Sequence, residues 1–176
     1  LPSPVPRVAS LLSAVCARPA CVFYPRFGAA AAGQAAYAPL KRPRADLQFQ
    51  NLLAPHFRNT RRRMAAERVV LLAQDTTTLS YNTLRKTTGL GAIGDKRPPG
   101  RGLRLHSLQA FRLDGIPLGC ASAELWARDP RSDTGQRQEQ SIDQKESVRW
   151  VNAFQRAALI AAQMPQTLVV VSGDRE

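Results

Sequence analysis

Two short apolar runs, one near the middle of the chain and one near its end, dominate the hydrophobic pattern. The first, Val69 to Ala73, is partly β-branched and bounded by polar residues, which predicts a buried strand that ends at Asp75 in a Thr/Ser-rich turn. The second begins at Thr167 and stops at Gly173-Asp174. If these strands are neighbours, their two aspartates lie side by side at one edge of a sheet.

Between these runs the pattern predicts a β-hairpin and then a helix. Alternation from Leu103 to Leu113, the turn signal Asp114-Gly115 and a return run from Ile116 to Trp126 predict two antiparallel strands. A helix with capping-box spacing at Asp143 to Glu146 follows and is stopped by Pro165. Its predicted core stripe is Trp150, Val151, Phe154, Ala157, Ala158, Ala161 and Met164. A right-handed crossover through this helix would make the last strand parallel to the first.

The first 68 residues show a different pattern. Residues 1–33 are rich in Ala and Pro, and we expect partial disorder or marginal helix there. Residues 46–57 predict a helix interrupted at Pro55, and residues 58–67 predict a second helix. The second helix carries a basic cluster, Arg58, Arg61, Arg62 and Arg63.

The loop region from Tyr81 to Gly102 is rich in glycine. Its glycine spacing does not match a phosphate-binding fingerprint, because prolines intervene and no helix opens after it. We expect a flexible hairpin connection near the predicted carboxylates.

Length and charge narrow the class of protein. A chain of 176 residues with 44% hydrophobic composition can form one domain with a true core. The formal net charge is +12, and residues 1–68 hold 11 basic and 2 acidic residues. This excess suits a polyanionic partner such as nucleic acid, and a solvated, disordered basic arm is the alternative.

Cysteine and hydropathy patterns argue against a zinc protein or a membrane protein. Cys16, Cys21 and Cys120 lack zinc-type spacing and are interpreted as reduced thiols of a cytosolic protein. No apolar stretch approaches the roughly 18–20 residues of a membrane span. The proline-interrupted start does not resemble a signal peptide, and both ends of the chain look cut.

The candidate chemistry centres on Asp75 and Asp174. Two adjacent carboxylates are what Mg²⁺ requires, since it is typically held by one or two carboxylates together with water and substrate phosphate. His106 lies in the predicted strand pair without a nucleophile motif, which favours a structural hydrogen-bonding role. Lys145 and Arg149 lie near a predicted helix start and either contact a phosphate or remain solvated beside a core Trp150.

Seven motifs of the chain resemble, in order and spacing, transposases of the IS4 family, especially the Tn5-like group. The resemblance covers about Gln34 to Glu176. Its motifs are Gln74-Asp75-Thr76-Thr77-x-Leu79-x-Tyr81, Gly89-Leu90-Gly91-x-x-Gly94, Arg101-Gly102-Leu103-x-x-His106-Ser107, Pro117-Leu118-Gly119, Trp126-x-Arg128, Lys145-Glu146-Ser147-x-Arg149-Trp150 and Gly173-Asp174-Arg175-Glu176.

The resemblance implies an α/β fold class, a partial ribonuclease H-like fold (βββαβ) preceded by a small, basic helical region. It divides the chain into residues 1–33, a basic DNA-binding region at 34–68 and a catalytic core at 69–176. It further implies a DDE transposase, in which two aspartates and a glutamate bind Mg²⁺ or Mn²⁺ for phosphodiester cleavage and strand transfer. Asp75 and Asp174 correspond to the two aspartates.

In the family the third carboxylate lies well beyond the position of Glu176, so we expect this chain to bind DNA without cleaving it. The implied partner is double-stranded DNA at transposon ends, with no membrane association, in the bacterial cytoplasm at the nucleoid. The full-length family is expected to form homodimers. The candidate DNA-binding residues are Arg58, Arg61, Arg62, Arg63, Lys145 and Arg149.

Two alternatives remain open at this point. One is a non-catalytic basic DNA-binding module or inhibitor derived from a transposase. The other is an unrelated nuclease of the same fold that recruits Glu176 or Asp95 as its third metal ligand.

Overall fold

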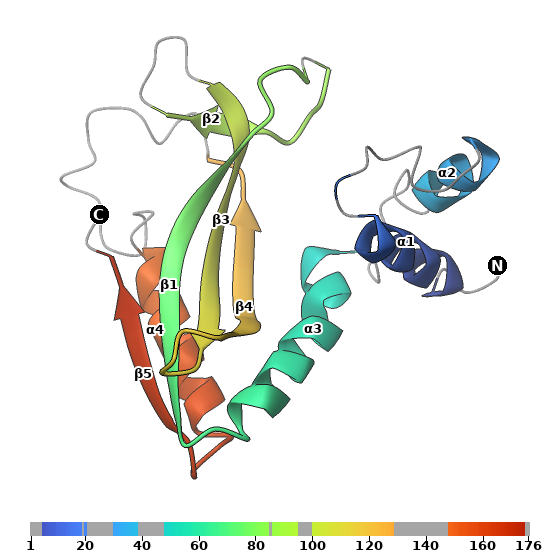
Figure 1. The fold of residues 1–176 in the computed structure, drawn as a ribbon. Coiled ribbons are helices and arrows are strands. Elements are labelled where there is room, and N and C mark those ends of the chain that lie inside the picture. Colours follow the sequence, from blue (N-terminus) through green and yellow to red (C-terminus); the bar gives the residue numbers. More distant parts are fainter. Residues whose placement is uncertain are drawn as a thin grey trace, which may run out of the picture. The chain divides into compact units, whose positions relative to one another are not determined.

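The structure is a computed structural model that describes residues 5–18, 20, 30–38, 48–84, 86–94, 100–128 and 148–174. The chain forms two compact units, Leu1–Leu52 and Leu53–Glu176. The first unit contains helices α1 (Val5–Ala17) and α2 (Ala30–Tyr37), which contact each other, and the first residues of α3 (Phe49–Met64). The rest of α3 belongs to the second unit, together with the sheet (Figure 1).

The second unit has a mixed α/β architecture. Its strands are β1 (Val69–Ser80), β2 (Gly91–Ile93), β3 (Gly100–Phe111), β4 (Pro117–Trp126) and β5 (Leu168–Gly173), and helix α4 (Val148–Ala161) precedes β5. Strand β1 lies between β3 and β5, and β3 also pairs with β4 and, at its other end, with β2. The order β4-β3-β1-β5 places β1 and β3 in the interior of the sheet (Figure 1).

Strand directions agree with the expectation from sequence. β3 runs antiparallel to both β1 and β4, and the predicted hairpin turn at Asp114-Gly115 joins β3 to β4. β5 runs parallel to β1, with Val69 opposite Leu168 and Gln74 opposite Gly173. The chain therefore reaches β5 through α4, as a crossover connection requires.

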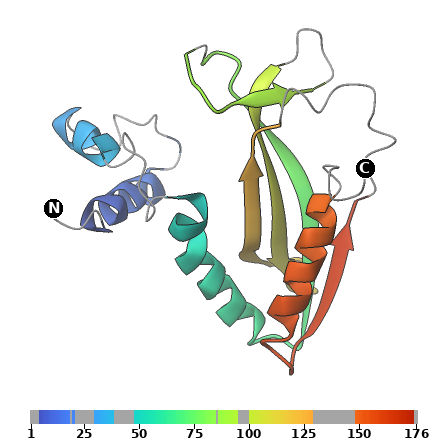
Figure 2. The same ribbon diagram turned by 180° about the vertical axis from the view of Figure 1, so that it is seen from behind.

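The hydrophobic core lies between one face of this sheet and the helices. α4 covers that face, as the view from behind shows (Figure 2). Met64 on α3, Leu72 on β1 and Ile160 on α4 are at most 1% exposed. The remaining core residues are Val70, Leu108, Ala110, Leu118, Ala121, Ala153, Ala157 and Met164.

The interruption predicted at Pro55 is absent. α3 is a single helix that runs through Pro55, so the two helices predicted over 46–57 and 58–67 form one element within the described residues. A proline inside a helix costs roughly 3 kcal/mol because it removes a hydrogen bond and crowds the preceding turn. Burial of Phe57, Thr60 and Met64 after the proline offsets this cost.

The predicted strand at Val69–Ala73 proves too short. β1 continues to Ser80, because its Thr-rich second half pairs with Gly102–His106 of β3. Asp75 therefore lies within the strand and not in a turn. The predicted loop from Tyr81 to Gly102 also contains the short strand β2.

The predicted core stripe of α4 is partly wrong. Val151 and Phe154 are 39% and 57% exposed, whereas Ala153 and Ile160 are buried. The helix approaches the sheet mainly through small alanines, so the larger Phe154 is displaced to its flank. The predicted capping box at 143–146 lies outside the described residues.

Candidate metal site and basic surface

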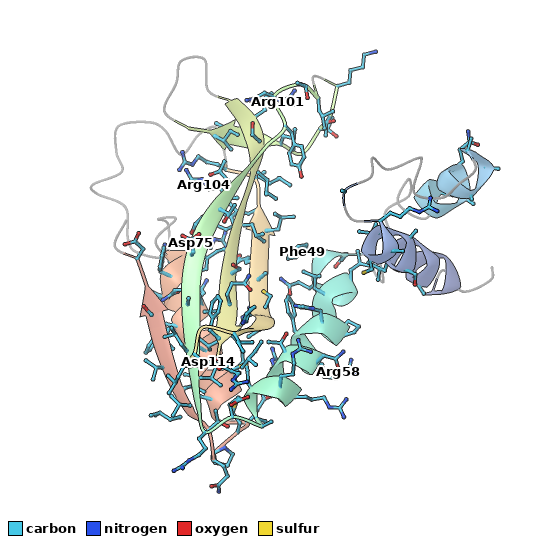
Figure 3. All side chains as sticks on the ribbon, in the orientation of Figure 1. Phe49, Arg58, Asp75, Arg101, Arg104 and Asp114 are labelled. Carbon is cyan, nitrogen blue, oxygen red and sulfur yellow. The ribbon has the colours of Figure 1, made fainter. Side chains whose placement is uncertain are left out.

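The parallel pairing of β1 and β5 brings Asp75 and Asp174 to neighbouring positions. The last registered pair is Gln74 with Gly173, and the two aspartates follow directly on each chain. Adjacent strands lie about 4.8 Å apart. Both aspartates are exposed, and Asp75 is labelled on β1 in Figure 3.

Gly173 sets how closely β5 approaches α4 at this point. A Cβ added at Gly173 would lie 2.7 Å from Trp150 Cζ3 and 2.9 Å from Gln74 Cγ. Only glycine fits between these two side chains, which explains the Gly-Asp sequence at the end of the strand.

Asp75 has polar neighbours on an exposed part of β1. Ser107 is its partner on β3, and the Thr77 hydroxyl is 3.5 Å from Asp75 Oδ2. Side chains alternate along a strand, and Gln74 and Thr76 both contact His106 on the α4 side. Asp75 therefore projects from the opposite face of the sheet.

His106 is buried beneath α4, and both of its ring nitrogens have hydrogen-bond partners. Nδ1 is 2.8 Å from Thr76 Oγ1, and Nε2 is 3.3 Å from Gln74 Oε1. The ring packs edge-on against Trp150 at 4.8 Å between centroids. Burial lowers the pKa of His106, the nearby Asp75 carboxylate opposes this shift and Arg149 adds to it. These contacts fit the predicted structural role.

The donor set at the aspartate pair suits a hard divalent cation. Asp75 and Asp174 would supply two carboxylates, and the remaining positions of an octahedral Mg²⁺ would be open to water and a phosphate oxygen. Among the described residues, no group of three His, Cys, Asp or Glu side chains could hold a metal ion. Asp95 and Glu176, the alternative third ligands, lie outside those residues.

The predicted basic cluster on α3 divides into two parts. Arg58 and Arg62, one helical turn apart, are exposed, and Arg58 is marked on α3 in Figure 3. Arg63 instead donates through Nε to the Leu118 carbonyl at 2.6 Å and through Nη2 to Thr60 Oγ1 at 3.2 Å. Arg61 is half-buried. Arg58 and Arg62 are therefore the members of the cluster best presented to a polyanion.

Arg149 is held by contacts within the protein. Its guanidinium forms an ion pair with Glu124 on β4 and lies over the Trp126 ring, 5.0 Å from the centroid. Its neighbour in the predicted motif, Lys145, lies outside the described residues.

Sequence reasoning missed two groups of residues. Asn152 and Arg156 lie with Arg149 along the side of α4 that faces β4, and their helical spacing was the available signal. Arg101 organises the loop after β1 by donating to the Thr87 carbonyl at 2.6 Å. That contact joins residues 14 apart and leaves no periodic pattern.

Within the described ranges, no helix combines the length and apolar character needed to cross a membrane. Neither a protein-family model nor a curated protein sequence matches this chain.

Proposed function

We propose that this chain is a DNA-binding protein of the DDE transposase type, similar to the IS4 family and its Tn5-like group. Asp75 and Asp174 are two of its carboxylate ligands for Mg²⁺ or Mn²⁺. When bound, such a metal ion supplies activation of the attacking oxygen and stabilisation of charge on the phosphodiester. The fold proposed with this function is the first part of a ribonuclease H-like domain.

The observation that carries the proposal is the register of β1 and β5. Gln74 is paired with Gly173, so Asp75 and Asp174 follow at adjacent positions although about one hundred residues separate them in sequence. The order of β1, β3, β4, α4 and β5 along the chain also supports it, because with the short β2 set aside it is the βββαβ order of the resemblance.

The proposal is tested first by Mn²⁺ binding to the purified chain. Asp75→Asn and Asp174→Asn each remove one carboxylate charge with little change in shape, and each is expected to weaken Mn²⁺ binding at least tenfold. Asp114→Asn is the matched control, because Asp114 is an exposed carboxylate in the β3–β4 turn. Equal Mn²⁺ affinity in all three variants would contradict a metal site at the aspartate pair.

Cleavage of supercoiled plasmid in Mn²⁺ is the second test. The family chemistry uses three carboxylates, so we expect DNA binding by these 176 residues without nicking. Nicking that both Asp75→Asn and Asp174→Asn abolish would show that two carboxylates suffice, and would overturn the expectation of an inactive chain.

The exposed pair Arg58 and Arg62 favours a second candidate function, a non-catalytic DNA-binding module. In that case DNA affinity falls steeply with salt and is indifferent to Mn²⁺. Each phosphate contact contributes about 0.9 to the slope of log affinity against log salt concentration. The double variant Arg58→Gln, Arg62→Gln should lower that slope by about 1.8. If the salt dependence of DNA affinity is unchanged in the double variant, Arg58 and Arg62 do not contact DNA phosphates.

A further inference from the structure

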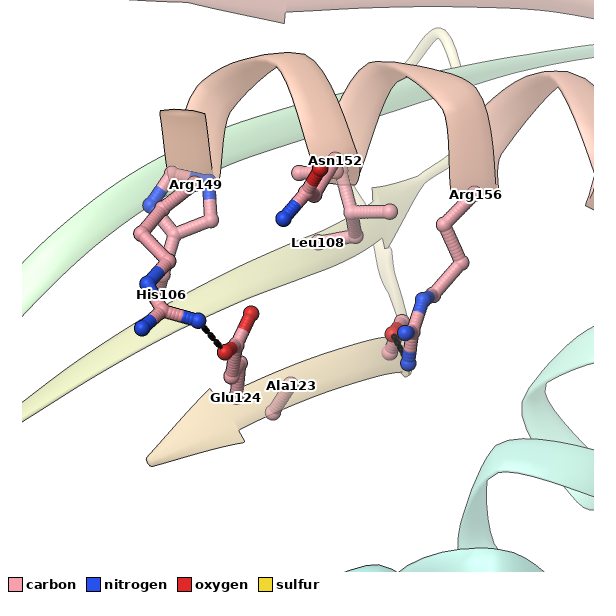
Figure 4. Close-up of a pocket in the computed structure, with 9 residues that line it drawn as sticks. His106, Leu108, Ala123, Glu124, Arg149, Asn152 and Arg156 are labelled. Atoms are coloured by element: carbon pink, nitrogen blue, oxygen red, sulfur yellow. Dashed lines mark hydrogen bonds and ion pairs between the residues drawn. The ribbon is translucent and has the colours of Figure 1, made fainter. Parts of the chain in front are cut away.

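A small, open hollow lies between α4 and strands β3 and β4 (Figure 4). Ser122 and Ala123 line it from β4, and Asn152 and Ala153 line it from α4. Longer side chains surround it. The described residues that line it are His106, Leu108, Ser122, Ala123, Glu124, Arg149, Asn152, Ala153 and Arg156.

The helix side of this hollow is a polar stripe. Arg149, Asn152 and Arg156 recur at intervals of three and four residues, so they project from one side of α4 toward β4 (Figure 4). Two guanidinium groups and one amide therefore meet at a single opening. Among the described residues that line it, Glu124 is the one carboxylate.

The two arginines differ in how they are engaged. Arg149 is ion-paired with Glu124 and stacked on Trp126. Arg156 reaches Ser122 Oγ at 3.4 Å, which is a long contact, and among the described residues no carboxylate is ion-paired with it. Because the Glu124 carboxylate is ion-paired with Arg149, the positive charge of Arg156 has no carboxylate partner among the described lining residues.

We propose that this hollow is a phosphate-binding site, with Arg156 and Asn152 as the direct ligands. A planar guanidinium can donate two parallel hydrogen bonds to phosphate oxygens, and the Asn152 amide can add a third. Glu124 opposes phosphate binding, because its ion pair holds the Arg149 guanidinium at the rim. The floor is Leu108 and the buried ring of His106, so the phosphate is recognised from the helix side.

The site does not use Asp75 or Asp174 and goes beyond the proposed function in that respect. The same chemistry fits two sources, a DNA backbone phosphate and a free phosphate ion. Assignment to DNA rests on the proposed function.

Titration of the isotope-labelled chain with inorganic phosphate, followed by NMR, tests the site. We expect shifts at Ser122, Asn152 and Arg156, and at least tenfold weaker binding in Arg156→Gln and Asn152→Asp. Lys86→Gln removes one exposed positive charge elsewhere and should bind phosphate like the unmodified chain. If Arg156→Gln and Lys86→Gln bind phosphate with equal affinity, the proposal that the hollow binds phosphate is wrong.

Glu124→Gln supplies a readout that misfolding cannot imitate. It removes the carboxylate from the hollow and releases Arg149, so phosphate binding should become several-fold tighter. Unchanged or weaker binding in a folded Glu124→Gln variant would contradict the charge argument.

A short DNA duplex distinguishes the two sources. If the bound group is a DNA phosphate, duplex DNA displaces inorganic phosphate, and Arg156→Gln lowers the salt slope by about 0.9. If the slope is unchanged while inorganic phosphate binding is weakened, the site takes a free phosphate. Mn²⁺ binding at Asp75 and Asp174 is measured without phosphate, so failure of the metal site is seen separately.

Discussion

Helices α3 and α4 both place arginines against β4, with different results. Against β4, α3 packs closely: Arg63 donates to the Leu118 carbonyl, and His56 Nε2 accepts from the Cys120 amide at 3.2 Å. Against the same strand, α4 leaves a hollow lined by Arg149 and Arg156. An arginine whose donors meet backbone carbonyls stabilises the fold, and one that faces a hollow is available for a ligand.

The largest effect is expected where α3 meets Gly119. A Cβ there would lie 2.7 Å from Thr60 Oγ1 and 2.9 Å from Arg63 Nη2, and φ is +120°. Gly119→Ala should therefore lower the free energy of unfolding by roughly 3 kcal/mol through overpacking and backbone strain. Gly115 has φ +84° with open space around it, so Gly115→Ala should cost only about 1 kcal/mol. Urea unfolding measures the free energy of unfolding of both variants. Equal losses would mean that α3 does not pack closely against β4 at Gly119.

An intermediate effect should separate the two arginines directly. Arg63→Gln removes a charged donor to a carbonyl and should cost about 1.5 kcal/mol of folding stability. Arg156→Gln should change stability by less than about 0.5 kcal/mol, because it removes only a long contact to Ser122. The same urea unfolding curves measure this difference. If the two variants lose similar folding stability, Arg63 and Arg156 do not differ in their contribution to the fold.

The smallest effect concerns pH. Burial holds the pKa of His106 below its ordinary value of 6.5, so the unfolded chain binds this proton more readily than the folded chain. Stability is therefore complete above pH 6.5 and falls as the pH drops from 6.5 toward the lower folded pKa. In His106→Gln this part of the dependence should vanish. His56→Gln, which alters the other histidine of the chain, should retain it. Thermal unfolding of both variants across this pH range measures the effect. If the pH dependence of stability persists in His106→Gln, it arises from another residue.

The succession of strand, hairpin, helix and strand was predictable from sequence because it depends on hydrophobic periodicity and turn chemistry. The Asp114-Gly115 turn and the apolar run before Gly173 are local signals, and both elements formed as predicted. The parallel arrangement of β1 and β5 then followed from the intervening helix. The neighbouring positions of Asp75 and Asp174 could be predicted for the same reason.

What could not be predicted depends on tertiary packing. Pro55 is tolerated because residues after it are buried against the sheet, and Phe154 is exposed because alanines make the closer contact. β4 also departs from regular alternation, with irregularities opposite Leu108/Gln109 and Ala110/Phe111. These allow Ala121, Ser122 and Ala123 all to be buried, and they shape the hollow that no periodic pattern indicated.

The pairing of β1 with β5 also affects the order of folding. Thr167 Oγ1, just before β5, donates to the Glu67 carbonyl at 2.8 Å across a sequence separation of 100 residues. Contacts of such separation close large loops and form slowly. The β3–β4 hairpin can form early, whereas Asp75 and Asp174 become neighbours only when β5 docks. Under the proposed function, metal binding by this pair would therefore report the docking of β5, the last of the strands to join the sheet.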